Sequence, residues 1–100
     1  MSLIIAGTFR LPVEVLELAK AHLEAVITAT RAEDGCLIYS YAHDTEQPGL
    51  IRVFEHWRDQ QAVDAHFASA HMKAWQVERA RLGISERRIF AYEVASEREI

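Results

Sequence analysis

The segment 55–75, EHWRDQQAVDAHFASAHMKAW, contains most of the side chains in this 100-residue sequence that could take part in chemistry. His66 and His71 lie on one expected helix, and Trp75, one turn further on, shares a helix face with His71. Histidine titrates near neutral pH, so one interpretation is a ligand pocket between helix and sheet with either histidine as its polar group. The other is that both are partly buried helix residues bonded to backbone carbonyls. Residue types alone favour the second.

The spacing of the two histidines argues against a metal site. On a straight helix, a separation of five residues turns side chains about 140° apart, whereas histidines that share a metal ion typically lie four residues apart. The sequence also lacks a paired-cysteine motif and a glycine-rich phosphate loop. Its only cysteine, Cys36, is expected to be a small core residue rather than a nucleophile.

Glu55 and Trp57 lie on the same face of an expected strand that precedes this helix. A buried carboxylate needs a partner, so Glu55 is expected either to orient a pocket histidine, or to cap the following helix or pair with an arginine such as Arg58. Tyr39 and Tyr41, on the preceding strand, are expected to pack on the sheet rather than to donate protons.

The elements that must position these residues follow from hydrophobic patterning and turn signals. Helices are expected from Pro12 to Glu33, with Gly35 as the C-terminal cap, and from a cap at Asp59 to about Leu82, with a stripe through Val63, Phe67, Ala70, Ala74 and Val77. Strands are expected at 3–10, 36–43, 50–57 and 86–95, with a type II turn at Pro48-Gly49. The order β-α-β-β-α-β predicts a ferredoxin-like α+β fold with a four-stranded antiparallel sheet. The chain is expected to form a single domain over residues 1–100.

These strands are apolar on both faces, as Phe90 and Tyr92 against Ile89 and Ala91 illustrate. Two helices cover only one face of a four-stranded sheet. The other face is expected to pair with a second copy, giving a homodimer. The alternative is an apolar surface that the monomer tolerates, although large exposed patches are uncommon on monomers.

Composition restricts the partners. The net charge is −4 and the pI about 5.7, and no window carries a basic run, so nucleic-acid binding is not expected. The first residues lack the features of a signal peptide or membrane span. With one cysteine, the chain is expected to be reduced and cytoplasmic, with a small ligand or another protein as its partner.

Three motifs resemble those of the antibiotic biosynthesis monooxygenase domain. They are an E-x-G-C-x-x-Y strand start, an E-x-W strand end and an H-x-x-x-x-H helix, found here in AEDGCLIY (32–39), FEHWRD (54–59) and AHFASAH (65–71). Each motif is weak alone, but the three together, in this order on this succession of elements, are fairly specific. The resemblance covers roughly residues 3–95.

The resemblance implies a dimeric α+β barrel and an enzyme that oxygenates a phenol or hydroquinone with O₂ and no cofactor. An electron-rich phenolate can itself pass an electron to O₂, so the protein need only deprotonate it and keep it dry. On this view His71 is the best candidate base, with His66 at the pocket edge. Glu55 orients the imidazole or stabilises its cation. The implied pocket lining is Trp57, Phe67 and Trp75.

Other functions occur on the same fold. One alternative is a module that binds a small aromatic metabolite without turning it over. A second is haem breakdown, but the haem-degrading branch uses an Asn on the first strand, which is absent here, and a Trp in the middle of the second helix, where this chain has His66.

Overall fold

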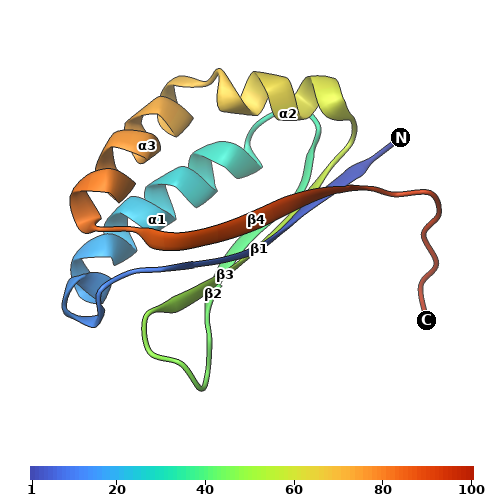
Figure 1. The fold of residues 1–100 in the computed structure, drawn as a ribbon. Helices are drawn as coiled ribbons and strands as arrows, with labels where there is room; N and C mark the ends of the chain where they lie inside the picture. The colour runs from blue at the N-terminus through green and yellow to red at the C-terminus, as the bar shows by residue number, and fades with distance from the viewer.

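The computed structural model describes residues 1–100. It consists of a four-stranded antiparallel sheet with all helices on one face (Figure 1). The spatial strand order is β2-β3-β1-β4, the ferredoxin-like arrangement that the sequence predicts. The elements in chain order are β1 (Leu3–Arg10), a 3-10 turn η1 (Val13–Val15), α1 (Leu16–Arg31), β2 (Cys36–His43), β3 (Leu50–Trp57), α2 (Gln60–Phe67), α3 (Ala70–Leu82) and β4 (Ser85–Glu93).

The strands agree with prediction apart from the last, which begins and ends slightly earlier. The β2–β3 connection closes with the Leu50 N–H donating to the Gln47 carbonyl at 3.1 Å. Gly49 takes a φ of 83°, the left-handed conformation that a type II turn requires at its third position. A bulge between Cys36 and Ile38 shifts the register at the start of β2.

The first helix is shorter than predicted. It begins after η1 and ends at Arg31, with Ala32 as its cap. Gly35 does not cap the helix but takes a φ of 86° in the turn into β2. As a consequence, Glu33 lies outside the helix, in the connection between α1 and β2.

The second predicted helix is two helices, α2 and α3, separated at Ala68 and Ser69. Asp59 caps α2 as expected and accepts a hydrogen bond from the Ala62 N–H at 2.9 Å. The single stripe predicted across both helices is wrong, because the break changes which way α3 faces. Phe67 and Val77 are 43% and 57% exposed, while the buried residues of α3 are Met72, Trp75 and Leu82.

The core lies between the helices and the inner face of the sheet, where Phe9, Ile51 and Val53 pack against Met72 and Trp75. None of the helices combines the length and hydropathy needed to cross a membrane.

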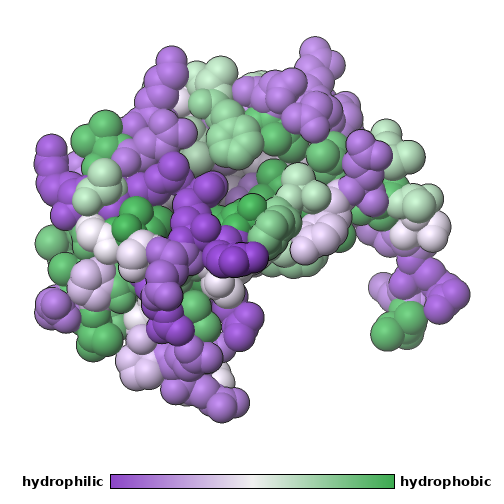
Figure 2. Space-filling view, in the orientation of Figure 1, coloured by the Kyte–Doolittle hydropathy of each residue, from purple (hydrophilic) through white to green (hydrophobic).

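The outer face of the sheet, away from the helices, carries large exposed side chains. Ile38, Phe54, Phe90 and Tyr92 are each 40–55% exposed. Ladder pairing places Ala6 between Phe54 and Phe90, so these side chains form one band across the strands. Figure 2 shows hydrophobic residues along this underside of the sheet, in the hollow between the β2–β3 turn and the C-terminal segment.

Candidate functional site

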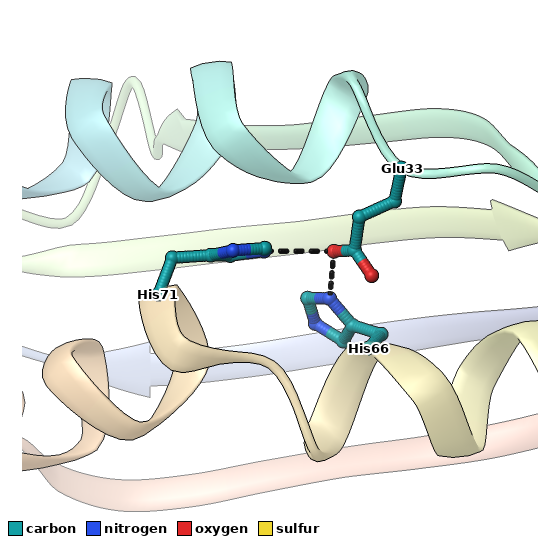
Figure 3. A group of neighbouring side chains, drawn as sticks. All are labelled: Glu33, His66 and His71. Atoms are coloured by element: carbon teal, nitrogen blue, oxygen red, sulfur yellow. Dashed lines mark hydrogen bonds and ion pairs between the residues drawn. The ribbon is translucent and has the colours of Figure 1, made fainter.

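One carboxylate oxygen of Glu33 joins the two helix histidines. The Oε2 atom lies 2.6 Å from Nδ1 of His66 and 2.8 Å from Nε2 of His71. The three side chains come from the α1–β2 connection, the end of α2 and the start of α3, and they point toward one another (Figure 3). The expectation that the histidines diverge is therefore wrong.

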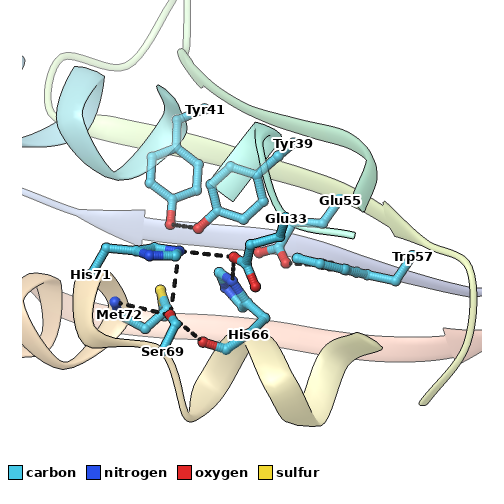
Figure 4. A network of polar contacts seen from close by, with 9 residues as sticks. All are labelled: Glu33, Tyr39, Tyr41, Glu55, Trp57, His66, Ser69, His71 and Met72. Carbon is cyan, nitrogen blue, oxygen red and sulfur yellow. Dashed lines mark hydrogen bonds and ion pairs between the residues drawn. The ribbon is translucent and has the colours of Figure 1, made fainter. Parts of the chain in front are cut away.

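Ser69 explains why they converge. Its hydroxyl donates to the His66 carbonyl at 2.6 Å, which closes the end of α2, and accepts from the Met72 N–H at 3.3 Å, which caps the start of α3. Serine is a favoured N-cap because its side chain satisfies a free backbone N–H at the helix start. The same hydroxyl lies 3.3 Å from Nε2 of His71 (Figure 4). The rotation predicted for a straight helix does not apply across this break.

The contact with Glu33 assigns the tautomer of His66. A carboxylate accepts hydrogen bonds, so the proton on His66 lies on Nδ1, and Nε2 keeps a free lone pair. Burial lowers the pKa of His66, although Glu33 opposes that effect. The side chain is 1% exposed, and no protein group bonds its Nε2. Figure 4 shows one ring nitrogen of His66 directed at the Glu33 carboxylate. His66 is thus a neutral, oriented proton acceptor.

A small cavity lies beside His66, between α3 and the inner face of the sheet. Its volume is about 20 Å³, close to the space that one water molecule needs. The apolar part of the lining includes Phe9, Met72 and Trp75. The polar part consists of Tyr39, Tyr41, Glu55, His66, Arg79 and Arg87.

A larger groove of about 400 Å³ runs between α1 and β2. It contains Tyr41 but none of Glu33, His66, His71 and Glu55. His66 and Glu55 line the smaller cavity, together with Tyr39 and Tyr41, and we take this cavity as the site for that reason.

Two tyrosine hydroxyls line one wall of the cavity and bond each other, with 2.7 Å between the oxygens of Tyr39 and Tyr41. Burial raises the pKa of Tyr39 strongly and that of Tyr41 to about 12. Both hydroxyls keep their protons at neutral pH, and since only one proton lies between the two oxygens, the other is free to donate. The expectation that these residues only pack on the sheet overlooked this hydrogen-bond donor.

Glu55 takes neither of the partners expected from the sequence. It accepts a hydrogen bond from Nε1 of Trp57 at 2.9 Å, while Arg58 pairs with Asp34 and Asp59. Burial raises the pKa of Glu55 to about 7. At neutral pH this carboxyl is therefore poised between its charged and neutral forms.

The predicted site residues divide into two groups. His66, Glu55, Phe67 and Trp75 line the cavity. His71 and Trp57 do not line it. The ring of His71 lies 6.0 Å from that of His66, and both imidazoles contact Glu33. Trp57 is fully buried with its ring 4.7 Å from that of His66.

Several site residues were absent from the sequence-based set: Glu33, Tyr39, Tyr41, Arg79 and Arg87. Glu33 opens the E-x-G-C-x-x-Y motif, so a signal for it existed. The arginines carry no local signal.

The cluster of Glu33, His66 and His71 could also hold a metal ion, contrary to the spacing argument. Their ligand atoms all lie within 4.8 Å of one another, and two imidazoles with one carboxylate suit several divalent transition metals.

Comparisons with known proteins agree with this architecture. A family model described as antibiotic biosynthesis monooxygenase matches residues 2–78. Among curated proteins, "Putative monooxygenase Rv0793" of Mycobacterium tuberculosis is 42% identical over 52 residues, 52% of this chain and 50% of that protein. An uncharacterized Synechocystis protein is 29% identical over 69 residues, 69% of this chain and 47% of its own length. The matches thus span about half the length of these curated relatives.

Solved structures match over nearly the whole chain. A "putative antibiotic biosynthesis monooxygenase" from Deinococcus radiodurans superposes with a TM-score of 0.89 and 29% identity, covering 100% of this chain and 98% of that one. The structure of Rv0793 gives a TM-score of 0.79 and 27% identity, with 99% and 98% covered.

Proposed function

Because the chain belongs to the antibiotic biosynthesis monooxygenase family, as the match over residues 2–78 establishes, we propose that it is a monooxygenase that oxidises a small phenol or hydroquinone with O₂ and without a cofactor. One oxygen atom enters the ring and the other leaves as water. For a hydroquinone the products are a hydroxyquinone and water, so the substrate itself supplies both electrons and both hydrogens that the second oxygen atom needs.

The contact between Glu33 and Nδ1 of His66 is the observation that carries this proposal. It leaves Nε2 of His66 as a proton acceptor on the cavity. A phenol in the cavity gives its proton to that nitrogen, and the carboxylate of Glu33 stabilises the imidazolium that forms. His71, on the same carboxylate oxygen, holds Glu33 in place.

The apolar setting then favours electron transfer from the phenolate to O₂, because it excludes water from the reactive pair. After the oxygen adduct forms on the ring, the free proton of the Tyr39–Tyr41 pair can hydrogen-bond its outer oxygen. The imidazolium of His66 can return its proton when the O–O bond breaks and water leaves.

The present cavity is smaller than a substrate. Ligand pockets typically measure about 300–1,000 Å³, against about 20 Å³ here. Entry therefore requires side chains at the mouth to move. Phe67, at 43% exposure the most exposed apolar residue of the lining, is the natural one to do so.

The test is oxygen consumption by chelator-treated protein across a panel of hydroquinones and anthrones. With a substrate found, His66→Ala should lower turnover by ~10²–10⁴-fold, the usual loss for a general base. His71→Ala should cost less, since Glu33 still holds His66. His22→Ala, on the surface of α1, is the control and should leave the rate unchanged.

Full activity in His66→Ala combined with a large loss in His71→Ala would instead make His71 the base, as the helix face alone suggested. No oxygen uptake with any member of the panel would reject the proposed reaction.

We also propose that two copies pair through the outer face of the sheet. The apolar band of Ile38, Phe54, Phe90 and Tyr92 supports this assembly, because nothing in the chain covers it. In sedimentation, Phe90→Glu should shift the protein to monomer, since a charge would enter the interface. Val77→Glu, at a slightly more exposed apolar position on α3, should not. A monomeric parent protein at micromolar concentration would contradict the proposal.

A further inference from the structure

Two arginines, the half-buried Arg79 and the exposed Arg87, line the cavity without forming an ion pair with the protein. Arg79 follows Met72 and Trp75 at helical spacing on the buried side of α3, and Arg87 lies two residues before Ile89 on β4. Neither guanidinium makes a hydrogen bond or an ion pair. Four of the other arginines find acidic partners, namely Arg10, Arg52, Arg58 and Arg81, whereas Arg31, Arg88 and Arg98, outside the cavity, do not.

The arrangement is electrostatically unfavourable as it stands. Arg79 is half-buried, and both its burial and the nearby charge of Arg87 lower its pKa. A charge taken partly out of water without a partner is costly. The one carboxyl on the cavity wall, Glu55, accepts a hydrogen bond from Trp57, and its burial raises its pKa to about 7 although the charge of Arg87 opposes that effect. Although the chain as a whole has a net charge of −4, this cavity has a surplus of positive charge.

We propose that Arg79 and Arg87 bind a carboxylate carried by the aromatic substrate, so that the enzyme acts on phenolic acids. This inference rests on the proposed function and names its substrate class. Guanidinium groups present paired N–H donors that match a carboxylate. The aromatic and aliphatic side chains between them and His66 suit the ring.

The spacing along α3 fits such a ligand. Ten residues separate Ser69 from Arg79, or roughly 15 Å of helix at 1.5 Å per residue. Long helical side chains lean toward the helix N-terminus, so the guanidinium lies closer to His66 than its backbone does. The remaining span, on the order of 10 Å, matches the length of a bicyclic phenol with its carboxylate at the far end, once side chains at the mouth have moved to enlarge the cavity.

Calorimetric titration tests the inference without requiring turnover. The probes are 6-hydroxy-2-naphthoate and 2-naphthol, which differ by the carboxylate alone. The parent protein should bind the acid at least tenfold more tightly. Arg79→Met and Arg87→Met should each lose at least that factor for the acid and leave the affinity for 2-naphthol unchanged.

Two arginines serve as matched controls. Arg81 lies on the same helix but is exposed and paired with Glu78, and Arg88 lies next to Arg87 but over the Phe90 ring. Arg81→Met and Arg88→Met should keep the preference for the acid.

The inference is overturned if the parent protein shows no preference for the acid, or if Arg79→Met and Arg87→Met weaken both probes equally, which would indicate a structural role. Carboxylate-dependent binding with no oxygen uptake would support the anion site and reject the oxygenation, so the two failures can be told apart.

Discussion

Replacing Glu55 by Gln should remove a loss of stability that the parent protein undergoes as the pH rises. Burial raises the pKa of Glu55 from 4.5 to about 7, so the folded state binds this proton more tightly than the unfolded state does. The contribution of Glu55 to the free energy of unfolding is fully present below pH 4.5 and is lost as the pH rises through 7. The difference in pKa, roughly 2.5, corresponds to about 3 kcal/mol.

Gln is a suitable replacement because it is neutral at every pH and its side-chain oxygen can still accept the hydrogen bond from Trp57. Urea unfolding at one protein concentration, from pH 5 to pH 8, gives the free energy of unfolding of both proteins. The free energy of unfolding of the parent protein, minus that of Glu55→Gln, should fall by up to about 3 kcal/mol from pH 5 to pH 8. Glu99→Gln, in the exposed C-terminal segment, is the control for loss of a charge. Parallel curves for the parent and Glu55→Gln would refute the assignment of Glu55 as a buried, proton-binding carboxyl.

Three further outcomes follow from the site and the sheet. Ser69→Ala should lower the free energy of unfolding by about 1 kcal/mol, as loss of an N-cap does. It should also lower turnover, because the hydrogen bond from Ser69 to the His66 carbonyl is lost. Turnover equal to that of the parent protein would contradict this. Gly7→Ala should destabilise the protein by at least the roughly 1–3 kcal/mol typical of overpacking, because a Cβ there would lie 2.0 Å from the Arg88 carbonyl oxygen. Thermal melts measure the loss of stability, with Ala6→Gly as the comparison variant. Dialysis against a chelator should leave oxygen uptake unchanged, and a loss restored by one divalent metal would assign the Glu33 cluster to metal binding.

The strands were predictable because their signals are local. Alternating or continuous apolar runs bounded by Pro48-Gly49 and Gly35 define them, and ladder pairing then follows from the order of elements. The helix break was not predictable from periodicity, because residues 60–82 consist largely of good helix formers and a single stripe could be drawn through them. Only the two hydrogen bonds of Ser69, one to each helix, reveal that the chain changes direction there.

The same break explains the errors at the candidate site. On a straight helix His71 shares a face with Phe67 and Trp75, which made it the leading base, and His66 points elsewhere. In the folded chain His66 lines the cavity, whereas His71 contacts Glu33 and does not line the cavity. Glu33 was missed although it opens the E-x-G-C-x-x-Y motif, because its role depends on contacts with residues 33 and 38 positions further along the chain, which the motif does not specify.

The two-residue interruption at Ala68 and Ser69 also sets the rotational phase of everything that follows on α3. Deleting one residue from a helical path turns the remainder by about 100°, which would take Arg79 away from the cavity and Met72 and Trp75 out of the core. The number of residues between α2 and α3 therefore matters more for the site than the identity of each residue. Ala68 can be exchanged for other small residues, whereas an insertion or deletion between His66 and His71 would disrupt both the cavity and the core packing of α3.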